Sequence, residues 1–144
     1  MFLSKDNYIE KIQSFTIEDW KPLLELIPII ETTKEFSVIS EITKSDDGVL
    51  IVPHAHEHKV VSQFQKIAYQ MPIVIDFDWK SWDQGRKIFK DENFDFDTTD
   101  ICTICKYITT IIRADRFSEG ALVSVFNSGQ ILRMLKSIER QIMA

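Results

Sequence analysis

The chain has 144 residues, of which 44% are hydrophobic and 27% are charged, as in an ordinary globular protein, and we expect one domain over residues 1–144. Its formal net charge of −5 argues against nucleic-acid binding, because binding phosphates requires a basic surface. It holds neither an apolar run of roughly 20 residues that could span a membrane nor the apolar core of a signal peptide, so a cytoplasmic protein is expected.

Two helices are predicted near the N-terminus. The first covers residues 4–15, where apolar side chains recur at helical spacing. Thr16 and Asp19 resemble a capping box that opens the second helix, and Pro28 marks its expected end. The segment 29–44 fits either a strand or a short helix, and its pattern leaves both open.

The middle of the chain mixes strand and helix signals. A turn is predicted at residues 45–48, and the apolar run at 49–52 reads as a short buried strand. Apolar residues at helical spacing predict a helix over residues 57–71. The segment IVIDFDW, residues 73–79, is the second strand candidate.

The C-terminal half is predicted to be helical throughout. Asp78 is expected to cap a helix beginning at Trp79, and Asp97 to cap a central helix with an isoleucine-rich stripe. Ser118 is the expected cap of a shorter helix, and residues 131–142 form the terminal one. These elements predict a mainly α fold, a single compact helical domain with two short β-strands; an α+β fold is the alternative.

Three histidines close together suggest a metal site. His54, His56 and His58 follow an apolar strand, as the His-x-His pairs of many metal-dependent hydrolases do, and imidazole is a good zinc ligand. Asp76 and Asp78 could add oxygen ligands. Surface histidines before a helix are the simpler interpretation, so we expect no cofactor, with a divalent metal as the alternative.

The two cysteines are predicted to be structural. Cys102 and Cys105 have the spacing of a redox Cys-x-x-Cys pair. Such a pair sits at a helix N-terminus, where the helix dipole lowers the thiol pKa. Here both residues fall inside the predicted central helix, so two small buried side chains are expected instead.

The segment RADRFSEG places four charged side chains between two predicted helices. Most residues of this segment have a structural explanation. Arg113 can bind the last carbonyls of the preceding helix, and Glu119 suits the first turn of the next. Arg116 and Glu119 can pair, Phe117 can insert into the core, and Gly120 can allow two helices to approach closely.

The same cluster also has a functional interpretation. Arg113 and Arg116 could bind an anionic group, with Asp115 and Glu119 holding the two guanidinium groups in place. Charge patterning alone favours the structural interpretation.

The stretch YITTIIRADRFSEGALVSVFNSGQILRMLKSI, with IDFDWKSWDQG before it, resembles a bacterial family known only as a domain of unknown function. The resemblance covers residues 73–140, and the family has no established activity. The signature positions it implies are Arg113, Asp115, Arg116, Phe117, Glu119, Gly120, Asp78, Trp79 and Trp82. The histidine cluster is not part of that pattern.

These observations favour a binding or interaction module over an enzyme. Its binding face would combine the RADRF-x-EG corner with the FDW-x-x-W helix. The expected partner is a protein or a small anionic ligand, and neither a membrane nor a nucleic acid. Two alternatives stay open: a metal-dependent hydrolase built on His54, His56 and His58, and a pocket for a small anion at Arg113 and Arg116.

Overall fold

The predicted mainly α fold is confirmed by the computed structural model, which describes residues 5–39, 43–44, 48, 50–51, 55–118 and 120–143. The α-helices are α1 (Lys5–Ser14), α2 (Ile17–Leu24), α3 (Ile27–Thr32), α4 (Lys59–Gln70), α5 (Asp83–Lys90), α6 (Ile101–Asp115), α7 (Ala121–Asn127) and α8 (Gln130–Met143). Two short 3-10 helices, η1 (Trp79–Ser81) and η2 (Phe96–Thr98), precede α5 and α6.

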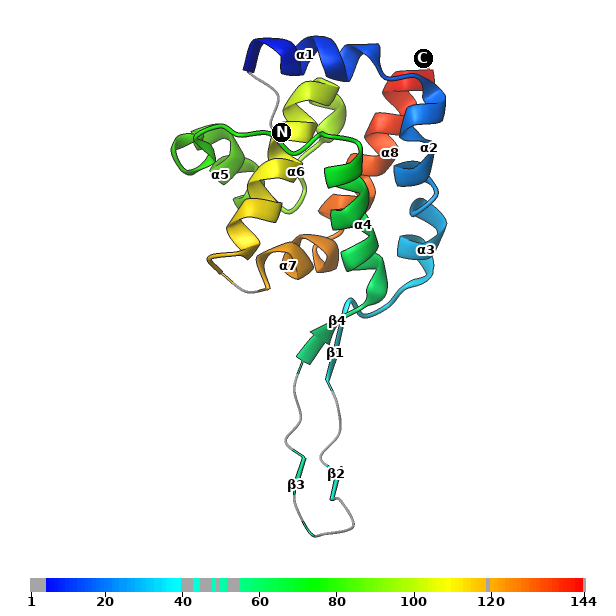
Figure 1. Cartoon of the computed structure of the whole chain (residues 1–144), viewed down its shortest axis with the longest axis vertical. Coiled ribbons are helices and arrows are strands. Elements are labelled where there is room, and N and C mark those ends of the chain that lie inside the picture. Colours follow the sequence, from blue (N-terminus) through cyan, green and yellow to red (C-terminus); the bar gives the residue numbers. More distant parts are fainter. Residues whose placement is uncertain are drawn as a thin grey trace.

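Helix α6 is the central helix, as its isoleucine stripe predicts. Ile104, Ile108 and Ile112 are fully buried, and α1, α5, α7 and α8 all contact this helix. Figure 1 shows α5 beside α6, on the side of the body away from α2 and α3. None of the described helices is long and apolar enough to cross a membrane.

The boundaries of the N-terminal helices follow their capping residues. The predicted capping box is confirmed: the Thr16 amide donates to Asp19 Oδ2 at 2.8 Å, and the Asp19 amide donates to Thr16 Oγ1 at 3.3 Å. The prediction that Pro28 ends this helix is wrong. Helix α2 ends at Leu24, and Pro28 lies in the first turn of α3, where a missing N–H removes no helical hydrogen bond.

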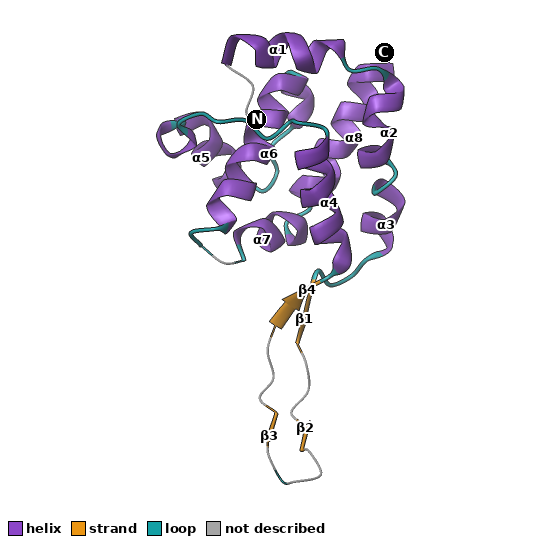
Figure 2. Cartoon of the chain, viewed as in Figure 1, coloured by secondary structure: helices purple, strands orange, loops and turns teal. Residues whose placement is uncertain are grey.

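Between α3 and α4 the described residues include four short strands, which extend away from the helical body (Figure 2). β1 (Ser37–Ile39) pairs antiparallel with β4 (Ala55–Glu57), and β2 (Thr43–Lys44) pairs antiparallel with β3 (Leu50–Ile51). The undecided segment 29–44 therefore contains the end of α3 as well as β1 and β2. The predicted strand at 49–52 is found as β3, and the predicted turn lies mostly outside the described residues.

The second strand candidate, residues 73–79, is not a strand. Ile73, Val74 and Ile75 are buried, but the segment runs beside helices, where the described residues provide no neighbouring strand. Side chains bind its backbone instead. The Ile73 carbonyl accepts from the Tyr8 hydroxyl at 2.8 Å and from Thr109 Oγ1 at 3.1 Å, and the Ile75 amide donates to Thr109 Oγ1 at 3.4 Å.

The cap of the central helix is Asp100, and the prediction of Asp97 is wrong. Asp100 Oδ1 accepts from the Thr103 amide at 2.7 Å, so α6 begins three residues later than expected. Asp97 instead lies in η2 and holds α8. It accepts from Ser137 Oγ at 2.6 Å and pairs with Arg140 at 3.0 Å, and these two partners lower its pKa below the ordinary value.

Candidate binding groove

A groove of about 500 Å³ lies between η1 and α5 on one side and α6 and the start of α7 on the other. We call it the α5–α6 groove. Tyr107, Ile111 and Ala114, which follow one another at spacings of four and three on α6, form its floor, and Ala121 of α7 closes one end. The floor of the groove is therefore mostly apolar.

The opposite wall comes from the FDW-x-x-W segment and the helix after it. Trp79 and Phe89 present aromatic rings, and the side chain of Phe89 is exposed over 48% of its surface. The predicted helix beginning at Trp79 is in fact the single turn η1, and α5 begins only at Asp83. Asp78 precedes η1 and makes no side-chain capping bond, which corrects its predicted role.

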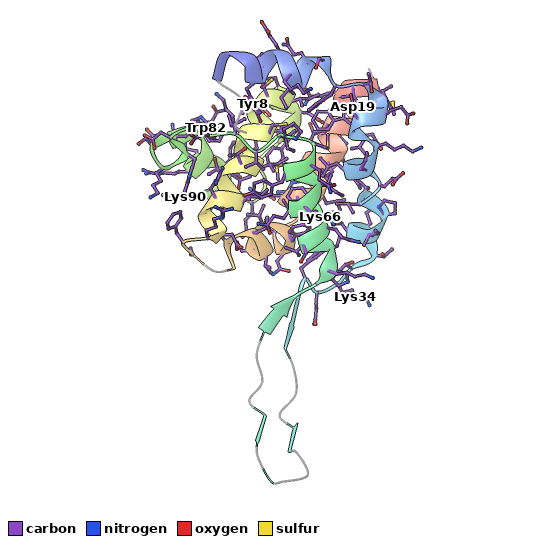
Figure 3. The ribbon with its side chains drawn as sticks, in the orientation of Figure 1. Tyr8, Asp19, Lys34, Lys66, Trp82 and Lys90 are labelled. Carbon is purple, nitrogen blue, oxygen red and sulfur yellow. The ribbon has the colours of Figure 1, made fainter. Side chains whose placement is uncertain are left out.

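Trp82, the second tryptophan of this segment, positions α5 and does not line the groove. Its ring makes an edge contact with Phe77, with ring centres 5.8 Å apart. It also covers Gly85: a Cβ at this glycine would lie 2.6 Å from the Trp82 ring. The absence of a side chain at Gly85 therefore lets the indole pack directly on α5. Trp82 and Lys90 are seen on the same side of the helical body in Figure 3.

Replacement of Gly85 by alanine is expected to lower the free energy of unfolding by about 1 kcal/mol. Helix propensity alone would favour alanine by about 1 kcal/mol, but the added methyl group must displace the Trp82 ring, and such overpacking costs about 1–3 kcal/mol. Urea denaturation measures the change. In a Trp82→Phe background the same replacement should be less harmful, and an equal loss there would contradict this explanation.

Three cationic side chains, Lys80, Arg86 and Lys90, lie along the rim of the groove, and its lining contains no carboxylate. Arg86 is partly engaged: it donates to the Lys80 carbonyl and lies 3.8 Å from Asp83. The Lys80 ammonium lies 4.7 Å from the centre of the Phe117 ring. Lys90 makes no ion pair within the described part of the chain. The rim is therefore positively charged although the whole chain is acidic.

Asp115 of the RADRF segment caps α7. Its Oδ1 accepts from the Gly120 amide at 3.2 Å and from the Leu122 amide at 3.1 Å. The prediction that Ser118 caps this helix is therefore wrong. Gly120 has φ of +94°, a conformation that favours glycine, whereas a Cβ there would have no neighbour within 4 Å. Backbone conformation, and not the predicted close approach of helices, explains this glycine.

Phe117 is not in the core, which corrects a second prediction for this corner. Its side chain is 74% exposed, because α6 ends at the surface and the turn that follows lies outside the packed helices. Its ring instead lies beside Trp79, with ring centres 6.1 Å apart. The RADRF corner and the FDW-x-x-W segment therefore meet through these two aromatic residues at the edge of the groove.

The two arginines of the corner have different surroundings. Arg113 is half-buried in the last turn of α6, where a cation complements the helix dipole. Arg116 is exposed, and its Nη2 donates to the Tyr69 hydroxyl of α4 at 3.1 Å. The predicted pairing of Arg116 with Glu119 cannot be followed, because Glu119 lies outside the described residues. Neither arginine lines the groove.

The histidine cluster is only partly described. His58 caps α4 by accepting from the Val60 amide at 3.1 Å through Nδ1. His54 and the side chain of His56 lie outside the described residues, and Asp76 is exposed. Among the residues that the structure describes, no three histidine, cysteine or carboxylate side chains gather in a way that could hold a metal.

The prediction that Cys102 and Cys105 lie well inside the central helix is wrong, because α6 begins only at Ile101 and the two cysteines are its second and fifth residues. Cys105 is fully buried and Cys102 is half-buried, and burial raises the pKa of both thiols above the ordinary value. A raised pKa disfavours the thiolate that redox chemistry uses, so burial, and not distance from the helix N-terminus, supports the structural interpretation of this pair.

Most residues that line the groove were not among the predicted site residues. Trp79 was predicted, whereas Lys80, Phe89, Lys90 and Tyr107 were not. One available signal was the spacing of Arg86, Phe89 and Lys90, three and four residues apart, which puts them on one face of a short helix. That this face lies against α6 depends on tertiary packing.

The comparisons with known proteins identify a family. A protein-family model described as a family of unknown function, DUF6508, matches residues 15–144. The match includes α2 and α3, and so extends well beyond the resemblance over residues 73–140. No curated protein and no solved structure matches the chain. Because the family model covers most of the sequence, the chain belongs to DUF6508, a family whose function is unknown.

Proposed function

We propose that this protein is a binding module and that the α5–α6 groove is its binding site. The observation that carries the proposal is the groove itself, where the FDW-x-x-W segment and the second half of α6 face each other. Its volume of about 500 Å³ falls within the range typical of small-ligand sites. Its lining is mostly apolar with a few charged groups at the rim, which is also typical of such sites.

The composition of the groove favours binding over catalysis. Its titratable lining residues are Lys80, Arg86, Lys90 and Tyr107, and it includes no carboxylate, histidine or cysteine. Tyr107 donates its hydroxyl proton to Gln130 Oε1 at 2.7 Å, and burial raises the pKa of this tyrosine. A general base positioned for proton transfer at neutral pH is therefore missing from this surface.

A variant that fills the groove should abolish binding. Thr110 lines the groove, and its hydroxyl donates to the Lys106 carbonyl of its own helix. Thr110→Phe should therefore fill the groove without breaking a contact between helices. The measurement is backbone amide NMR during titration with a set of soluble aromatic fragments. In the wild-type protein, shifts are expected in α5 and in the second half of α6, and Thr110→Phe should remove them.

Thr103→Phe is the matched control. Thr103 is also half-buried on α6 but lies two turns away, outside the groove. This variant should bind the fragments as the wild-type protein does. Shifts that persist in Thr110→Phe, or that are centred on another surface, would show that the groove is not the binding site.

A further inference from the structure

We propose that the α5–α6 groove takes a small free organic anion with an aromatic body, such as an aryl carboxylate. This inference rests on the proposed function, because it assigns the chemistry of the ligand at the same site. The aromatic body would lie on the apolar floor, and the carboxylate would lie at the cationic rim.

Charge complementarity supports an anion. Three cations and no carboxylate line this groove, and of these three cations only Arg86 forms an ion pair with a described residue, Asp83, at 3.8 Å. The hollows beside α2 are different, because carboxylates such as Glu18 and Glu25 line them. In an acidic chain this groove would therefore attract an anion that the surrounding surface repels.

The arrangement of the rings supports an aromatic body. Trp79 and Phe89 form one wall, and the floor at Ile111 and Ala114 is apolar. A flat ring system can bury both faces between such surfaces, and aromatic pairs contribute beyond the area they bury. Phe89, which lines the groove, is 48% exposed, and Phe117, which lies beside Trp79 at its edge, is 74% exposed, so apolar surface faces solvent here.

Lys90 is expected to contribute most to charge recognition. Its ammonium has no ion-pair partner among the described residues, whereas Arg86 is shared with Asp83 and with the Lys80 carbonyl. The Lys80 ammonium lies against the rings of Phe117 and Trp79, 4.7 and 5.7 Å from their centres. A ligand carboxylate can therefore pair with Lys90 without displacing an existing contact.

Three probes with the same ring and different charge test this inference: 2-naphthoate, 2-naphthamide and 2-naphthylmethylammonium. Isothermal titration calorimetry at low salt measures the affinity of each. We expect the carboxylate to bind about tenfold more tightly than the amide, since charge-assisted hydrogen bonds are the stronger ones, and the ammonium to bind most weakly. Added salt should reduce the preference for the carboxylate.

Lys90→Gln and Lys87→Gln form a matched pair on α5. Lys90 lines the groove, whereas Lys87 is exposed on the same helix and does not. Lys90→Gln should weaken naphthoate binding severalfold and leave naphthamide binding unchanged, and Lys87→Gln should change neither. An equal loss for both probes in Lys90→Gln would indicate a structural effect and overturn the assigned role of Lys90.

The remaining outcomes separate this inference from the proposed function. Equal affinities for naphthoate and naphthamide would overturn the inference that the ligand is an anion, while the proposal that the groove is a binding site would stand. If no naphthyl probe binds but other fragments shift the amide NMR signals of the groove residues, only the inference of an aromatic anion as ligand is rejected. If neither the naphthyl probes nor the other fragments bind in the groove, both this inference and the proposed function fail. A peptide ending in phenylalanine that bound about tenfold more tightly than naphthoate would overturn the assignment to a small free molecule.

Discussion

Replacement of Gln130 by leucine is expected to lower the free energy of unfolding by about 3 kcal/mol, because three hydrogen bonds of about 1 kcal/mol each are lost. Gln130 is 1% exposed and begins α8. Its Oε1 accepts from the Tyr107 hydroxyl at 2.7 Å, and its Nε2 donates to the carbonyls of Ile88 at 2.8 Å and Asp91 at 3.0 Å.

The loss follows from what leucine leaves behind. The Ile88 and Asp91 carbonyls each keep a backbone donor, the amides of Asp91 and Phe94, respectively. The Tyr107 hydroxyl, in contrast, would be left buried without its acceptor. Gln130 thus joins the C-terminal end of α5 to α6 and α8, and its loss should loosen the wall of the groove as well as the fold.

Chemical denaturation and thermal melts measure this effect, and the melting temperature should fall by about 10 °C. Adding Tyr107→Phe should restore part of the stability, because it removes the hydroxyl that has no acceptor. Gln84→Leu, at an exposed position of α5, is the control and should change little. A double variant that is less stable than Gln130→Leu alone would refute the explanation based on an unsatisfied hydroxyl.

Sequence patterns predict this fold best where one local rule decides the outcome. The stripe of isoleucines predicts α6 because burial of one helix face is encoded at a fixed spacing. The capping box at Thr16 and Asp19 is also local, since both hydrogen bonds lie within four residues. The resemblance over residues 73–140 likewise depends on short motifs that can be recognised without a structure.

The wrong predictions are those where several local solutions compete and tertiary contacts choose among them. Asp97 and Asp100 are both acceptable helix caps. Asp97 does not cap α6, because its carboxylate binds Ser137 and Arg140 of α8 instead. The apolar segment 73–79 has strand composition, but its neighbours are helices. Phe117 is hydrophobic and yet exposed, because its partner is Trp79 at a groove and not the core.

The groove is the least predictable feature for the same reason. Its floor and its wall come from segments about 25 residues apart in sequence. The sequence pattern of one segment does not indicate that it packs against the other. Packing of the Trp82 ring on Gly85 fixes where α5 lies, and Gln130 fixes its C-terminal end. Both constraints arise from three-dimensional contacts that single-sequence periodicity does not contain.

Asp115→Ala is expected to lower the free energy of unfolding by about 2 kcal/mol, since N-cap replacements cost about 0.5–2 kcal/mol and this side chain serves two amides. Asp115→Asn should lose less, because the amide oxygen can still accept both hydrogen bonds and only the charge is removed. Both variants are compared by urea denaturation at neutral pH. Asp76→Ala, at an exposed carboxylate that caps no helix, is the control.

The same turn offers an independent check through Gly120. Alanine at φ of +94° should cost about 1–2 kcal/mol of backbone strain, although a Cβ there would contact nothing. Because Asp115 binds the Gly120 amide directly, the two replacements should not be additive: once the cap is absent, the turn can relax and the strain becomes smaller. Strict additivity, or an Asp115→Ala variant as stable as Asp76→Ala, would mean that this aspartate does not hold α7.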